Sequence, residues 1–275
     1  MDTLSIGIFD LGLAAVLVVF LAAIMLPTNL GLSRSIIIAA VRTCVQLMLI
    51  GLVLKIVFAS ARLDWVIAIS MVMLLVAGRE VMVRQEHRFF GWWGYGLGTF
   101  SMFLSSFLVT LVALLVIISP HPWYEPRYAI PLLGMILGNT MTGVALAMNN
   151  LTRAAVHEQA KIEARLMLGY HPQVALSDIR RQSIHSGLIP IVNAMAAAGI
   201  VSLPGMMTGQ ILAGIPPIEA VKYQILIMFM IAAGSGFGTL GAVWLGSRRL
   251  FDDRHRLRLD RLSGRGDGGF TRRHG

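Results

Sequence analysis

The stretch Leu97–Ser119 reads LGTFSMFLSSFLVTLVALLVIIS and contains no charged residue and no histidine. An α-helix needs about 20 mostly apolar residues to cross the hydrocarbon core of a bilayer. Backbone polar groups in lipid must find their hydrogen bonds within the segment itself, which an α-helix achieves. This stretch therefore predicts a transmembrane helix.

Stretches of the same kind recur on both sides of it. Hydrophobic residues make up 56 % of the 275 residues and charged residues only 13 %, whereas a soluble domain carries about a quarter charged residues. The alternating pattern of a membrane β-barrel is absent. We therefore predict an all-α, polytopic membrane protein in the cell (inner or plasma) membrane with about seven transmembrane helices: Ile8–Leu26, Ser35–Phe58, Leu63–Val83, Leu97–Ser119, Ile130–Asn149, Gly187–Leu203 and Ile218–Leu245.

Basic residues are distributed unevenly among the predicted connections. The connections around Arg84, from Arg153 to Arg181, and after Arg248 are basic. With seven spans, all three fall inside if the N-terminus is outside and the C-terminus inside, as the positive-inside rule requires. The same rule accounts for the formal net charge of +9, so we expect the lipid bilayer as a partner and no nucleic acid.

The predicted permease domain covers residues 1–247. Within it, residues 150–186 form a long cytoplasmic connection with a helical pattern. Residues 248–275 form a basic cytoplasmic tail, which we expect to be disordered because its Gly- and Arg-rich end has little with which to build a core.

Several motifs of catalytic or nucleotide-binding proteins are missing from the sequence. It contains no G-x-x-x-x-G-K-[ST] loop, no HExxH and no CxxC, so a P-loop or a preformed zinc site is not predicted. We expect a transport subunit rather than an enzyme, with no cofactor of its own.

One motif lies in the cytoplasmic connection. Glu163, Ala164, Arg165 and Gly169 follow the E-A-x-x-x-x-G spacing of the coupling loop in ABC importer permeases. Such a helix needs an exposed charged face and a glycine to end it. The alternative is a solvated amphipathic loop helix with no partner.

Three polar residues lie inside the second and third predicted spans. Arg42 and Gln46 are four residues apart and share one helix face, and Glu80 lies near the cytoplasmic end of the next span. Charges within a membrane are costly and mark either a pathway or a partner. Arg42 therefore either contacts the cargo or forms an ion pair with Glu80.

A second polar group lies on the fifth and sixth predicted spans, and it consists of Asn139, Thr140, Thr142, Asn149 and Asn193. These side chains line a substrate pathway or link helices by hydrogen bonds. Thioethers suit soft metals, and the adjacent pair Met206 and Met207 is a weak candidate metal site, because most of the 16 methionines are ordinary filler in apolar runs.

Three long motifs identify a resemblance. The run from Pro131 to Asn149, the motif Glu163–Gly169, and the run from Asn193 to Gly214 resemble the FetB-type permeases of bacterial iron export ABC transporters and their plant aluminium-tolerance relatives. The resemblance covers nearly all of the chain from the second to the seventh span. The Arg-rich tail lies outside it.

The resemblance implies a separate cytosolic ABC ATPase, which binds ATP and Mg, in a complex of two permeases with two ATPases. It also implies export, with iron or another metal or metal-linked solute as cargo. Export of an anionic metabolite or nucleotide sugar is the alternative, which Arg42 favours, and a secondary transporter without an ATPase is a further one.

Overall fold

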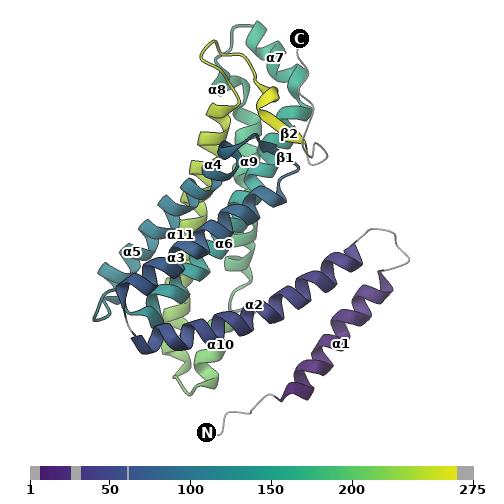
Figure 1. Cartoon of the computed structure of the whole chain (residues 1–275). Helices are drawn as coiled ribbons and strands as arrows, with labels where there is room; N and C mark the ends of the chain where they lie inside the picture. The colour runs from purple at the N-terminus through teal and green to yellow at the C-terminus, as the bar shows by residue number, and fades with distance from the viewer. Residues whose placement is uncertain (1–6, 26–31, 61, 265–275) are drawn as a thin grey trace. The chain divides into compact units, whose positions relative to one another are not determined.

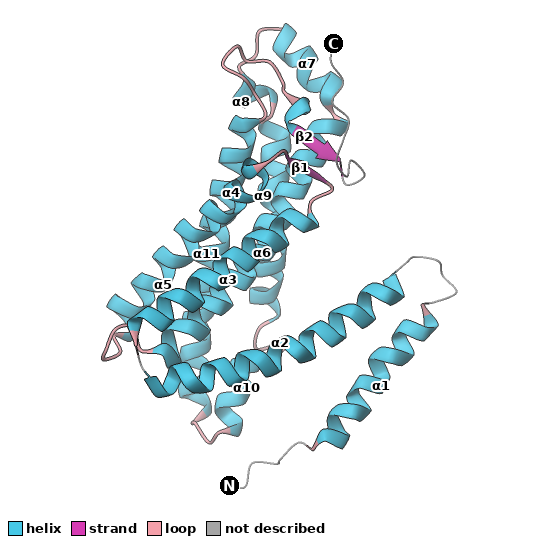
Figure 2. Ribbon diagram, viewed as in Figure 1, coloured by secondary structure: helices cyan, strands magenta, loops and turns pink. Residues whose placement is uncertain are grey.

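The computed structural model describes residues 7–25, 32–60 and 62–264. The chain divides into two compact units, Met1–Arg62 (unit 1) and Leu63–Gly275 (unit 2), and each is described by itself. Apart from two short strands, the named elements are helices, which confirms the predicted all-α class (Figure 2).

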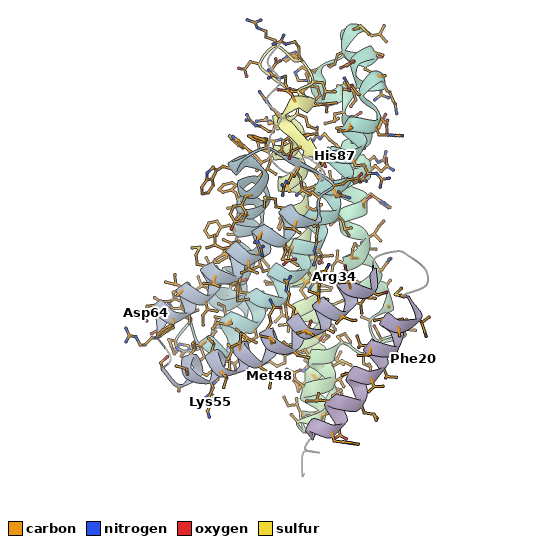
Figure 3. All side chains as sticks on the ribbon, turned by 45° about the vertical axis from the view of Figure 1, so that its right-hand side comes forward. Phe20, Arg34, Met48, Lys55, Asp64 and His87 are labelled. Atoms are coloured by element: carbon orange, nitrogen blue, oxygen red, sulfur yellow. The ribbon has the colours of Figure 1, made fainter. Side chains whose placement is uncertain are left out.

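Unit 1 is a pair of helices, α1 (Ile8–Ile24) and α2 (Leu32–Ser60), which pack against each other. Their exposed side chains are mostly apolar: Phe20 on α1 and Met48 on α2 expose 64 % and 76 % of their surface. A helix that exposes large apolar side chains along its length is typical of a membrane span. Arg34 and Lys55 lie toward the two ends of α2 (Figure 3), where long basic side chains can reach the polar interface.

Unit 2 is built on long helices that run between two ends of the unit (Figure 1). Pro126 and Pro217 each begin one of them, where a missing backbone N–H costs nothing. The long elements are α3 (Leu63–Arg84), the continuous helix α4–η2–α5–η3 (Trp92–Met102, Phe103–Phe107, Leu108–Val112 and Ala113–Ile118), α6 (Pro126–His157), α9 (Ser177–Ala197) and α11 (Pro217–Arg249).

Five helices of the described residues are long and apolar enough to cross a membrane: Ser33–Ser60, Leu63–Arg84, Trp92–Ile118, Pro126–His157 and Pro217–Arg249. Helices also occupy the other two predicted spans. However, α1 has only 17 residues, and α9 combines a polar first half with an apolar second half that ends at Ala197 rather than Leu203. The seven-span count therefore stays a prediction, and Leu26 lies outside the described residues.

The centre of unit 2 is the contact among α6, α9 and α11. Gly143 of α6 lies opposite Gly187 of α9, and a Cβ atom built on Gly187 would lie 2.7 Å from the carbonyl oxygen of Gly143. Small residues allow such close approach of helices in membranes. The side chain of Thr239 on α11 lies beside both glycines.

The predicted connection 150–186 is more regular than the sequence indicates. Helix α6 continues through His157, and α9 begins at Ser177. Only the segment between them leaves the bundle, as α7 (Gln159–Met167) and α8 (Pro172–Ala175). At the other end of unit 2 lies the short helix α10 (Gly205–Leu212) (Figure 1).

The tail differs from the prediction of disorder as far as Gly264. It turns back after α11, forms the short helix η4 (Leu259–Arg261), and adds β2 (Leu262–Gly264) antiparallel to β1 (His87–Phe89) (Figure 2). Arg261 donates hydrogen bonds to the carbonyl oxygens of Arg249 and Phe251 at 2.9 and 3.0 Å. These bonds satisfy carbonyl groups at the helix end, which composition alone does not reveal. Residues 265–275 lie outside the described part.

Candidate functional site

Helix α7 projects from the end of unit 2 that carries β1 and β2 (Figure 1). It ends at Met167, and Gly169, two residues further on, has a φ of +83° in the left-handed region. The N–H of Gly169 donates to the carbonyl of Leu166, and the N–H of Tyr170 donates to that of Arg165. This pair of bonds is the Schellman arrangement that ends a helix at glycine, so the predicted role of Gly169 as a terminator has a structural basis.

Two side chains attach α7 to the rest of unit 2. Ile162 is buried in the apolar core cluster. Arg165 donates to the carboxylate of Asp178 at 2.7 Å and to the carbonyl of Ala175 at 3.2 Å. These bonds join α7 to α8 and to the start of α9.

The opposite surface of α7 is exposed, and Glu163 and Met167 line an open groove between α7 and residues 254–257 of the tail. Glu163 and Ala164 are exposed, and the Glu163 carboxylate accepts a hydrogen bond from Gln159 at 2.8 Å. Beyond them, Met167 and Leu168 expose 82 % and 77 % of their surface. Adjacent exposed apolar side chains on a projecting element are typical of a protein interaction site. The sequence motif identified the charged residues of this surface and missed its apolar tip.

The bond between Arg165 and Asp178 predicts a pH dependence. The hydrogen bond and charge of Arg165 lower the pKa of the Asp178 carboxyl below its ordinary 3.8. A depressed folded-state pKa means that the stabilisation is complete above 3.8 and is lost as pH falls through the folded-state value. We expect hydrogen–deuterium exchange, corrected for the pH dependence of intrinsic exchange, to show α7 loosening in that acidic range. Asp178→Asn, which lacks the titrating group, should show no such step; an identical step in this variant would contradict the assignment.

The predicted polar group on α6 divides between two faces of the helix. Asn139 is exposed and Thr142 half-buried, three residues apart near the middle of α6. The Asn139 amide donates to the carbonyl of Met135 at 2.8 Å, and the Thr142 hydroxyl donates to that of Gly138 at 3.2 Å. The Thr142 hydroxyl proton and one of the two Asn139 amide N–H groups are used within the helix, so these side chains present oxygen lone pairs and one amide N–H to the outside.

Thr140 points to the other side, into the interior of unit 2. Its side chain is fully buried against Gly234 and Gly238 of α11. Its hydroxyl finds no hydrogen-bond partner among the described residues, nor do those of Ser106, Ser235 and Thr239. These buried hydroxyls come from three different helices, so the sequence could not group them.

The remaining predicted pathway residues occupy different positions. The Asn149 side-chain oxygen accepts a hydrogen bond from the backbone N–H of Glu86 at 2.8 Å, so it holds the connection that follows α3. Asn193 is exposed on α9. Arg42 and Gln46 belong to unit 1 and Glu80 to unit 2, so the choice between cargo contact and ion pair for Arg42 stays a prediction.

The side chains of Met206 and Met207, which are neighbours on α10, point in different directions. Met207 is buried and lines a cavity of about 500 Å³ together with Met195, Met228 and Gln224, whereas half-buried Met206 is not among the lining residues. Neighbouring positions on a helix point about 100° apart. A metal role for Met206 and Met207 stays a prediction; among the described residues, no three His, Cys, Asp or Glu side chains form a metal-binding group.

The five membrane-length helices and their apolar surfaces define a multi-pass helical membrane protein. Residues 8–251 match the uncharacterised protein family UPF0014, and the chain belongs to this family of membrane proteins. It is 39 % identical to a UPF0014 membrane protein of Synechocystis over 83 % of this chain and 88 % of the relative.

Two other relatives carry more specific names. The chain is 33 % identical to the probable iron export permease protein FetB of Escherichia coli, over 92 % of this chain and 95 % of FetB. It is 34 % identical to the protein ALUMINUM SENSITIVE 3 of Arabidopsis thaliana, over 84 % of each. The predicted family resemblance is thereby confirmed. No solved structure matches the chain.

Proposed function

We propose that this protein is the permease subunit of an ABC transporter, and that a separate ATPase subunit hydrolyses ATP to drive export of iron or another metal or metal-linked solute. Two permeases would assemble with two ATPases. In this proposal all seven long helices, including α1 and α9, cross the membrane, with the N-terminus outside and the α7 end inside.

The observation that carries the proposal is the construction of α7. It is a short helix with a fixed end, a rigid attachment through Arg165 and Ile162, and an exposed apolar tip at Met167 and Leu168. A solvated loop helix gains nothing from such a tip, because exposed apolar side chains cost free energy in water. A docking partner that covers the tip removes that cost and can push on α9 through the Arg165 bonds.

The outward face of α6 supports a cationic cargo. Asn139 and Thr142 present oxygen acceptors near the middle of a membrane-length helix. Oxygen ligands bind hard cations directly or through the water molecules around them. This chemistry agrees with the name of FetB, a probable iron export permease.

The test of the proposal is ATPase activity of the reconstituted complex against a panel of metal ions and nucleotide sugars. We expect the permease to stimulate its ATPase and a metal ion to raise the activity further. Leu168→Glu should reduce this stimulation by about tenfold, because a charge at the tip blocks apolar contact. Glu163→Ala and Gly169→Val should weaken it less.

Asp253→Asn is the matched control, since Asp253 is an exposed residue at the same end of unit 2. It should couple like the wild type. Full stimulation by the Leu168→Glu complex would refute the docking role of α7. Stimulation by a nucleotide sugar and by none of the metals would refute the metal cargo.

A further inference from the structure

A small cavity lies where α8 and the start of α9 meet the end of α11. Its volume is about 130 Å³, and its lining includes His171, Arg180, Trp244, Arg248 and His255. None of the described residues that line it is acidic. We infer that this cavity binds a phosphate group, carried by an anionic phospholipid or by a soluble phosphate compound.

Each cationic or imidazole side chain reaches the cavity from a different place in the sequence. His171 is the N-cap of α8, and its Nδ1 accepts from the backbone N–H of Gln173. In the neutral ring the proton therefore lies on Nε2, which is a donor. His255 lies in the turn after α11, with its ring edge-on to that of His171 at a centroid distance of 5.0 Å.

The two arginines of the cavity differ from three arginines at the same end of unit 2 that form ion pairs. Arg165, Arg256 and Arg258 each pair with a carboxylate, at 2.7 to 2.9 Å. Arg248 instead lies over the Trp244 ring at 3.9 Å. The Nε atom of Arg180 is buried and has no hydrogen-bond partner among the described residues.

A general positive-inside bias would place arginines at the surface, where water satisfies their donors. It does not account for a buried guanidinium N–H without an acceptor, which is costly unless a ligand supplies one. Guanidinium groups match the geometry of phosphate oxygens and bind them by paired hydrogen bonds. The size of the cavity suits a phosphate group with some water rather than a whole nucleotide.

The level of the cavity also suits a lipid headgroup. Trp244 with Arg248, and Trp93 with Arg249, form two cation–π pairs near the end of α11. Tryptophan gathers at the membrane–water interface, and basic pockets between helices at that level bind anionic headgroups. A bound phosphate would bridge α8 and α9, which hold α7, to the end of α11. Phosphate binding at this cavity does not depend on the proposed function. Only an effect of the bound phosphate on ATPase coupling would rest on that proposal.

The experiment measures saturable binding to the purified full chain in two arms. Inorganic phosphate is titrated into protein in phosphatidylcholine nanodiscs, and phosphatidylglycerol is increased in a second set of nanodiscs without phosphate. Tryptophan fluorescence reports binding, because Arg248 stacks on Trp244, and Trp244→Phe identifies that signal. Retained lipid is counted by native mass spectrometry.

We expect saturable binding in one arm, with affinity reduced by about tenfold in Arg180→Gln and in Arg248→Gln. Saturation by phosphate assigns a soluble ligand, and saturation by phosphatidylglycerol alone assigns a lipid. Arg254→Gln removes the same charge from an exposed arginine that does not line this cavity, and it should bind like the wild type. Arg180→Lys, which keeps the charge and lacks Nε, should bind weakly even if Arg180→Gln fails to fold.

Two results would overturn the inference. One is the absence of saturable binding in both arms. The other is a loss of affinity in Arg254→Gln equal to that in Arg180→Gln and Arg248→Gln, which would show that only the general positive field attracts the anion.

Discussion

Replacing Gly187 by alanine should strongly destabilise the centre of unit 2. The added Cβ atom would lie 2.7 Å from the Gly143 carbonyl oxygen and 2.8 Å from both the Ala147 Cβ and the Thr239 Cγ2. These atoms belong to the α6 backbone and to short, buried side chains, so none of them is the end of a flexible chain that can move aside. Helices α6, α9 and α11 would have to separate, and interiors packed at crystal-like density resist such a shift.

We expect Gly187→Ala to lower the free energy of unfolding by about 3 kcal/mol, which is the upper end for overpacking a core, and Gly187→Val to prevent accumulation of folded protein. Thermal unfolding in detergent and the yield of monodisperse protein measure these effects. The matched control is Gly138→Ala on α6, where nothing lies within 4 Å of the new Cβ.

The control variant should be neutral or slightly stabilised, because alanine favours a helix over glycine by about 1 kcal/mol. Equal stability of Gly187→Ala and Gly138→Ala would show that α6 and α9 do not approach as closely as described.

The second large effect concerns cargo. The double variant Asn139→Leu and Thr142→Val removes both outward oxygen acceptors from the middle of α6 while keeping side chains of similar size. We expect cargo-stimulated ATPase activity to fall by about tenfold or more, equivalent to losing one or two hydrogen bonds in the rate-limiting complex. Basal ATPase activity and thermal stability should change little, because the lost bonds lie within a single helix.

Leu146 provides the matched control for the double variant. It is exposed on α6, four residues beyond Thr142, and therefore lies on the same side of the helix. Leu146→Ala should leave stimulation unchanged. If the double variant transports metal like the wild type, the outward face of α6 contributes no cargo contact, and the buried hydroxyls around Thr140 become the next set of residues to test.

The candidate site could be predicted only in part. The E-A-x-x-x-x-G spacing located α7 and its terminator, because helix ends are local features that depend on a few neighbouring residues. The polar group on α6 was also visible, yet Thr140 turned inward while Asn139 turned outward. Which face of an apolar helix is buried depends on its neighbours, and the sequence of a membrane span carries little amphipathic signal to show it.

The sequence could not predict which residues line the basic cavity. His171, Arg180, Arg248 and His255 are spread over more than eighty positions, and each is unremarkable in a basic cytoplasmic connection or tail. The tail fold was likewise hidden, because Arg261 and the β1–β2 pairing stabilise it through contacts with distant segments. Composition does not predict order in a short segment that is stabilised by packing against a core formed by other segments.

The sequence by itself determined that this chain is a helical membrane protein, because the bilayer imposes one rule on every span: apolar side chains over a membrane-length helix. It also determined where α7 ends. Only the tertiary structure decided that α6, α9 and α11 meet at Gly143 and Gly187, that Met167 and Leu168 are left exposed, and that two arginines and two histidines share one cavity. These are non-local contacts, and they follow from how helices of nearly uniform composition fit together rather than from any single segment.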